Sequence, residues 1–306
     1  MDSSELYHTK QLFVLGAYKA VVAQPLPDAN SPDYTSALLY QIRSYIALDD
    51  TDTALGLIPD GTENVALKAA SALARFVAAD EDDREPILEE LRDLSLALDD
   101  DVEGTEREKD LVRVLAGIAF SRAGETEEAL ETLGSETEDL EAVAVLVQIY
   151  LSIHRPDLAK KEFERSKRWA EDDLLLQLIE SSIALVTGVD NYNDPLSFYS
   201  EQIGNPSLSS THLLTSRAVT RILRGEVDAA KSDLEESRRE HDDEEALGAA
   251  LVVSGLSGFR AEQDELWEKF VSTYSTHPLA ADVAEKADLF DSALANYSVP
   301  ALPVVA

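Results

Sequence analysis

The sequence predicts an all-α protein built from a series of paired helices. Apolar residues recur at helical spacing along almost the whole chain, as at Leu111, Val114, Leu115 and Ile118, which is typical of helices with one buried face. Sustained alternation of apolar and polar residues, the pattern of a half-buried strand, is hard to find. Glycines, prolines and acidic clusters interrupt the helical pattern at short intervals, so the segments between them have the length of ordinary globular helices.

The segments between these interruptions group into helical pairs. We expect an incomplete first pair over residues 5–24 and a terminal capping helix over residues 279–297. Because stacked helical pairs form elongated arrays, the sequence predicts one solenoid over residues 1–297 and a flexible tail over residues 298–306. The full pairs predicted in between are 32–48 with 51–58, 62–79 with 83–98, 105–123 with 125–133, 139–153 with 156–169, 173–187 with 193–204, 209–223 with 226–240 and 243–257 with 261–274.

An alanine recurs in the second helix of several pairs. Ala54, Ala129, Ala159 and Ala230 are separated by 75, 30 and 71 residues, which is close to two, one and two units of about 34 residues, the period of a tetratricopeptide repeat. In that repeat a small residue of the first helix, here Gly117, lets the alanine of the second helix approach closely. The sequence therefore predicts a tetratricopeptide-like helical-repeat solenoid, an α-α superhelix.

Glycines stand at the turns between the paired helices. Gly124 and Gly225 are at positions where a left-handed backbone is expected, and glycine adopts that backbone without steric strain. The match to the repeat is degenerate, because the tryptophan usual in the first helix is absent. The helical-pair solenoid is thus predicted more firmly than the strict repeat pattern.

The composition excludes several classes of function. The formal net charge of −34 repels phosphate backbones and anionic lipids, so we expect no nucleic-acid binding and no direct membrane binding. The chain has no cysteine, which excludes disulfides and thiolate chemistry. The acidic N-terminus lacks the features of a signal peptide, and no run of about 18 apolar residues occurs. We therefore expect a protein of the cytosol or nucleus.

The sequence contains no recognisable catalytic or cofactor-binding motif. Its 13 glycines form no phosphate-binding loop, and its five histidines are far apart. The acidic runs Asp80–Asp83 and Asp99–Asp101 lack the ligand order of a calcium loop. We expect no enzyme activity, no cofactor and no metal.

One predicted helix concentrates basic residues. Acidic residues at positions 157, 162 and 164 are interleaved with them, so a salt-bridged outer face explains the pattern simply. A docking site for an acidic partner is the alternative. The basic residues are Arg155, Lys160, Lys161, Arg165, Lys167 and Arg168.

The first helices place apolar residues where tetratricopeptide proteins line their inner, concave surface. An open groove so apolar would mark a partner surface, because large exposed apolar patches are rare on isolated proteins. The alternative is that neighbouring pairs pack closely and these residues form core. The candidate partner-binding residues are Leu39, Ile46, Leu111, Val114, Ile118, Leu151, Val219 and Ile222.

Three blocks of the sequence resemble one family. Residues 157–188, DLAKKEFERSKRWAEDDLLLQLIESSIALVTG, closely resemble the central segment of the coatomer epsilon subunit family. The segments ELYHTKQLFVLGAYKAVVAQ and HPLAADVAEKADLFDSALANY are similar to the two ends of the same family. The resemblance is colinear over nearly the whole chain.

This resemblance implies a non-catalytic component of the COPI vesicle coat. It implies that the chain clasps the C-terminal domain of the coatomer alpha subunit, and through it joins the beta-prime subunit and the coat. It also implies a cytoplasmic protein that is peripheral on Golgi membranes and COPI vesicles, supports Golgi-to-ER retrograde and intra-Golgi transport, and reaches membranes only through the assembled coat.

Two other functions stay open from the residues alone. One is a helical-repeat subunit of an enzyme complex, such as the alpha subunit of a protein prenyltransferase, although that family carries recurring tryptophans and this chain has two. The other is a tetratricopeptide adaptor that binds acidic peptide C-termini, although the Lys, Arg and Asn side chains of such a clamp are scarce at the inner positions.

Overall fold

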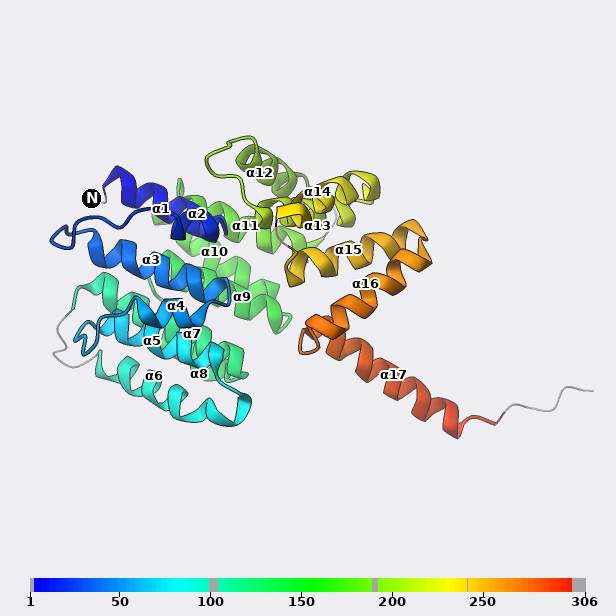
Figure 1. Ribbon diagram of the computed structural model, residues 1–306, viewed down its shortest axis with the longest axis horizontal. Helices are drawn as coiled ribbons and strands as arrows, with labels where there is room; N and C mark the ends of the chain where they lie inside the picture. The colour runs from blue at the N-terminus through cyan, green and yellow to red at the C-terminus, as the bar shows by residue number, and fades with distance from the viewer. Residues whose placement is uncertain (1–2, 99–103, 189–191, 241, 299–306) are drawn as a thin grey trace, which may run out of the picture. The chain divides into compact units, whose positions relative to one another are not determined.

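The described part of the chain is helical throughout. The computed structural model describes residues 3–98, 104–188, 192–240 and 242–298, and within them it contains α-helices, one 3-10 helix and no strand (Figure 1). The all-α prediction is therefore confirmed. The α-helices are α1 (Ser4–Val14), α2 (Tyr18–Val22), α3 (Tyr34–Ala47), α4 (Thr51–Gly56), α5 (Val65–Ala78), α6 (Glu85–Ala97), α7 (Glu106–Ala123), α8 (Thr126–Leu133), α9 (Leu140–Ser152), α10 (Pro156–Ala170), α11 (Leu174–Thr187), α12 (Asn193–Ile203), α13 (Thr211–Leu223), α14 (Val227–Glu240), α15 (Glu244–Ser257), α16 (Arg260–Thr273) and α17 (Pro278–Asn296).

The chain forms two compact units, residues 1–213 and residues 214–306. We call them the first and second units. The expected single solenoid over residues 1–297 stays a prediction, and the expected tail from residue 299 onward lies outside the described residues.

Helices of the first unit stack in two layers, as a helical-pair solenoid requires. The first helices of successive pairs contact one another in the order α3, α5, α7, α9 and α11. Each second helix packs on its own partner, as α6 does on α5, α8 on α7 and α10 on α9. The predicted pairs of the first unit are thus present, with ends displaced by a few residues.

Side-chain caps fix where many first helices begin. Helices α5, α9 and α11 start after Asn64, Asp139 and Asp173, whose side chains accept backbone N–H groups of the first turn. Thr105 and Glu108 form a reciprocal capping box at the start of α7. Some of the chain's many acidic side chains therefore accept hydrogen bonds from the free backbone N–H groups at helix N-termini.

Close packing within the pair α7–α8 depends on a glycine. A Cβ atom at Gly117 would lie 2.7 Å from Leu133 Cγ, so only glycine allows α8 to sit this close to α7. Phe120 and Ala129 are fully buried beside it. The turn residues Gly124 and Gly225 have φ angles of 84° and 79°, which confirms the predicted left-handed backbone.

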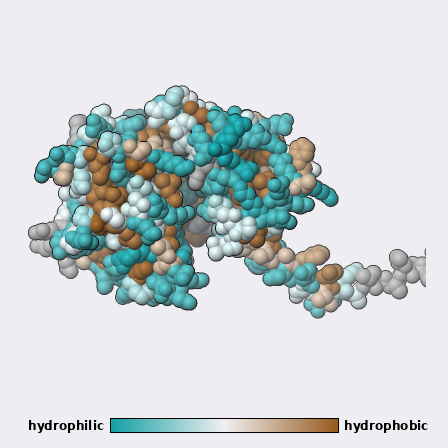
Figure 2. All heavy atoms as spheres, in the orientation of Figure 1, coloured by the Kyte–Doolittle hydropathy of each residue, from teal (hydrophilic) through white to brown (hydrophobic). Residues whose placement is uncertain are grey.

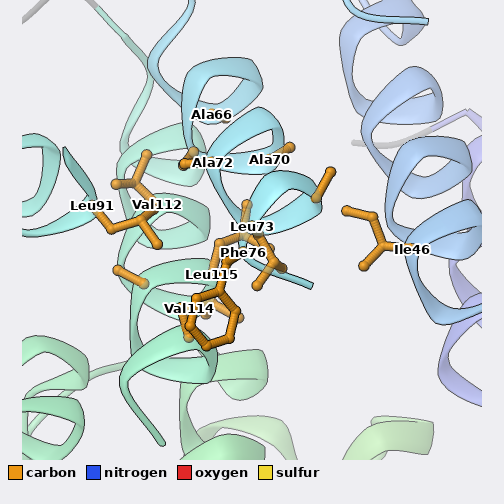
Figure 3. Packing of buried hydrophobic residues seen from close by; sticks show 14 of the residues in the cluster. Ile46, Ala66, Ala70, Ala72, Leu73, Phe76, Leu91, Val112, Val114 and Leu115 are labelled. Atoms are coloured by element: carbon orange, nitrogen blue, oxygen red, sulfur yellow. The ribbon is translucent and has the colours of Figure 1, made fainter. Parts of the chain in front are cut away.

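The core of the first unit runs between its first helices. Figure 3 shows Leu73 and Phe76 of α5 meeting Val114 and Leu115 of α7, with Ile46 reaching from α3 toward the same layer. Phe76 and Leu115 are 2% and 0% exposed. This layer holds α3, α5 and α7 side by side, and residues nearer the N-termini of α3 and α7 line a groove.

The second unit contains a buried ionic cluster and an uncovered helix. Asp233 of α14 accepts hydrogen bonds from Arg217 (2.7 and 3.0 Å) and from Arg221 (2.6 Å). Helix α17 packs on Leu247 and Phe270 only through its first turn, at Ala280, and the described residues from 281 onward are exposed. The predicted terminal helix is therefore confirmed, but most of its length covers no core.

Candidate functional site

A groove opens in the first unit where the first helices of several pairs meet. Its volume is about 390 Å³, and residues of α1, α3, α7, α9 and α11 line it. We call it the inner groove. Its lining residues are Lys10, Pro32, Thr35, Ser36, Leu39, Tyr40, Arg43, Thr105, Arg107, Glu108, Leu111, Asp139, Leu140, Glu141 and Leu175.

Ion pairs join the helices on either side of the inner groove. Arg43 of α3 is paired with Glu141 of α9, and its guanidinium lies 4.4 Å from the centroid of the Phe13 ring. Lys10 of α1 lies 3.2 Å from Asp173, the cap of α11. Because these cations already have carboxylate partners, they are poorly placed to clamp the C-terminus of a peptide.

Asp139 lines the inner groove, and its surroundings disfavour the ionised form of its carboxyl group. Its carboxylate accepts the Ala142 backbone N–H at 2.9 Å and so caps α9. Burial raises the pKa of Asp139, and the nearby Glu141 charge raises it further, whereas the cap bond works in the opposite direction. A basic side chain of a partner would therefore be attracted to this position.

A second cavity of about 650 Å³ adjoins the inner groove. Lys10, Asp139 and Leu140 line both spaces. The second cavity is flanked by Tyr7 of α1 and Trp169 at the end of α10, which are 55% and 40% exposed. Together the two spaces provide a continuous surface that mixes aromatic, aliphatic and charged groups.

Four of the eight predicted partner-binding residues are buried in the chain itself. Leu39, Ile46, Val114 and Leu151 are between 1% and 8% exposed. They pack into the layer between neighbouring first helices, as the core interpretation left open by the sequence requires. Leu39 nevertheless lines the inner groove with one edge.

The other four predicted residues are half-buried. Leu111 and Ile118 of α7 pack against the core of the first unit, and Val219 and Ile222 of α13 pack against the core of the second. Leu111 lines the inner groove. Contact of these residues with a partner stays a prediction.

Helix α17 presents an apolar stripe that sequence reasoning did not single out. Val283, Phe290, Leu294 and Tyr297 are 40%, 67%, 59% and 66% exposed. Figure 2 shows hydrophobic side chains at the surface of this helix, at lower right. The spacing of seven and four residues places Val283, Phe290 and Leu294 on one face of the helix, and Tyr297 follows as its C-cap. The spacing predicts this apolar face but not its exposure.

Neither a metal centre nor a membrane span is found in the described residues. No three potential ligand side chains there cluster in a way that could hold a metal ion. No described helix combines the length and the hydropathy needed to cross a bilayer.

Comparison with known proteins places the chain in one family. A family model described as "Coatomer epsilon subunit" matches residues 2–298. The probable coatomer subunit epsilon of Schizosaccharomyces pombe is 25% identical over 95% of this chain and 94% of its own length. Coatomer subunit epsilon-1 of Arabidopsis thaliana is 27% identical over 96% of this chain and 97% of its own length.

A solved structure supports the fold independently. A tetratricopeptide repeat protein from Parabacteroides merdae superposes with a TM-score of 0.55 at 15% identity, covering 82% of this chain and 97% of that chain. At this identity the likeness concerns the fold alone, and it confirms the predicted tetratricopeptide-like helical-repeat architecture.

Proposed function

Because the chain belongs to the coatomer epsilon subunit family, we propose that it is a non-catalytic structural subunit that binds and stabilises the C-terminal domain of the coatomer alpha subunit. The family is a component of the COPI vesicle coat. Through the alpha subunit the chain joins the beta-prime subunit and the rest of the coat. It thereby supports Golgi-to-ER retrograde and intra-Golgi transport.

The inner groove is the observation that carries this proposal. It exposes the half-buried Leu111 and an edge of Leu39 beside the charged groups Asp139 and Arg43. A surface that combines apolar anchors with a polar rim suits a folded protein partner better than a small substrate. The stripe on α17 supports the same proposal, because apolar side chains left in water favour a partner that covers them.

Substitution of Leu111 tests the inner groove. We expect Leu111→Glu in the full chain to weaken binding of the purified alpha C-terminal domain by about 2 kcal/mol or more, because a carboxylate would be desolvated at the interface. Leu96→Glu is the matched control, since Leu96 is 66% exposed on the second helix α6. Isothermal titration gives both affinities, and circular dichroism verifies the fold. Equal affinities of the two folded variants would contradict the proposal.

The proposed location follows from the proposed partner. The chain is cytoplasmic and becomes peripheral on Golgi membranes and COPI-coated vesicles when the coat assembles. Its net charge of −34 opposes direct contact with anionic lipids, so it reaches the membrane through the other subunits.

A further inference from the structure

The basic residues of α10 are a local exception in an acidic chain. Helix α10 contains five basic and three acidic side chains, whereas the whole protein has 26 basic and 60 acidic residues. The sequence suggested that interleaved acids neutralise this helix. The structure shows how far that neutralisation extends.

Only part of the basic charge is paired. Arg155, just before the helix, pairs with Asp157 at 2.7 Å, and Arg165 pairs with the buried Glu162 at 2.7 Å. Within the described residues, four further cations of α10 have no carboxylate within ion-pair distance. They are the exposed side chains of Lys160, Lys161, Lys167 and Arg168, of which Lys167 contacts the Phe163 ring.

These four cations lie on one face of the helix. Positions separated by one, seven and eight residues fall within about 120° of one another at 100° per residue. Ala159, Phe163 and Ser166 lie outside this arc and are buried. Two exposed acidic residues of α10 share this arc: Glu164, which lies between the cations, and Asp157, which lies one turn before Lys160 and is paired with Arg155. We call Lys160, Lys161, Lys167 and Arg168 the basic face.

We propose that the basic face is a docking surface for a short acidic peptide segment of a partner protein. This docking would be an additional interaction, separate from the proposed binding of the alpha subunit in the inner groove. The face extends about 12 Å along the helix axis, which matches about four residues of an extended chain. Complementary charge is the recognition chemistry, and Trp169 at its end is 40% exposed and borders the second cavity.

Acidic peptides fit this surface better than nucleic acids or lipid bilayers. Charges separated by more than about 8–10 Å are screened at physiological salt, so a short peptide senses mainly the basic face. A long polyanion or an anionic membrane would also meet the acidic surface that gives the chain its charge of −34. The small size of the face therefore selects a small acidic ligand.

A labelled hexaglutamate peptide tests the proposal by fluorescence anisotropy with the full chain in 50 mM salt. We expect Lys160→Glu combined with Lys161→Glu to weaken binding by about tenfold or more, and Glu164→Gln to tighten it by about threefold, because these changes alter the local charge in opposite directions. Arg239→Glu combined with Arg260→Glu is the matched control. It makes the same change in net charge at exposed residues outside α10, and it should alter affinity less than about twofold.

Three results would overturn the proposal. The first is the absence of measurable binding of hexaglutamate to the wild-type chain at millimolar concentration. The second is equal weakening by the two double variants, which would indicate an effect of net charge alone. The third is binding to phosphatidylserine vesicles that depends on Lys160 and Lys161 while hexaglutamate does not bind. Circular dichroism of each variant separates loss of binding from loss of fold.

Discussion

At the scale of single residues, Asp139 links the stability of the fold to the inner groove. The pKa of its carboxyl group is raised above the usual 3.8 by burial and by Glu141. Ionised Asp139 therefore opposes folding at neutral pH. As the pH falls through the raised pKa toward 3.8, the folded state binds the proton more tightly than the unfolded state and gains stability from this group.

The variant Asp139→Asn isolates this effect. Asparagine caps a helix as well as aspartate does, but it does not titrate. We expect the variant to be as stable as the wild type or slightly more stable at pH 7, by less than about 1 kcal/mol, and to become less stable relative to the wild type at pH 4, close to the usual pKa of 3.8. Urea unfolding at both pH values measures the difference. A difference that is constant or of opposite sign would refute the assignment.

Gly117 is the residue on which the packing of α7 against α8 depends. We expect Gly117→Ala to destabilise the first unit by about 1–3 kcal/mol, because the added methyl group would overlap Leu133. Gly56→Ala is the matched control, since a Cβ atom there meets nothing within 4 Å. The control should be neutral or stabilising by up to about 1 kcal/mol.

The two tryptophans allow this loss to be assigned to a unit. Trp169 belongs to the first unit and Trp267 to the second. In a Trp267→Phe background, the fluorescence of Trp169 reports urea unfolding of the first unit. If Gly117→Ala unfolded at the same urea concentration as Gly56→Ala, close packing at this pair would not require glycine.

At the scale of helices, α17 has exposed apolar side chains that are expected to contribute little to stability, and we propose that they contact the partner. Phe290 is 67% exposed, so we expect Phe290→Glu to change the free energy of unfolding by less than about 0.5 kcal/mol. The same change should weaken binding of the coatomer alpha C-terminal domain, because it puts a charge in the apolar stripe. Asp291→Glu, which keeps the charge of an exposed neighbour, is the control for titration calorimetry. Unchanged affinity of Phe290→Glu would remove α17 from the interface.

The helical pairs could be predicted because their signals are local. The 3.6-residue period and the turn glycines Gly124 and Gly225 depend only on nearby residues, and the structure places helices and turns where they indicate. The recurring alanines of the second helices also indicated the repeat length of about 34 residues. Local patterns were therefore sufficient for the architecture within each pair.

The candidate site could be predicted only in part, because it depends on how neighbouring pairs pack. Whether Ile46 or Val114 faces a groove or the next helix is decided by the spacing of α3, α5 and α7, and both residues are buried there. Leu111, one turn before Val114, remains at the groove. The apolar stripe of α17 has the same periodicity as a core helix, so its exposure could not be read from spacing.

At the scale of the whole molecule, the net charge of −34 disfavours lipids and nucleic acids as partners and leaves other proteins as the expected partners. A net charge of this size favours solubility and disfavours phosphate-rich partners. Against this background, we propose that partner binding relies on the apolar side chains at the inner groove and on α17, and on the basic face of α10. A structural subunit that recognises other proteins, and not lipids or nucleic acids, is consistent with this distribution.

The central claim is that the chain binds the coatomer alpha subunit as a structural partner. Its most direct test is affinity purification of the tagged full chain from a cytosolic extract, with quantification of the recovered proteins by mass spectrometry. We predict that the coatomer alpha and beta-prime subunits are recovered in amounts equal to the chain. Recovery of the folded chain without these subunits would contradict the account.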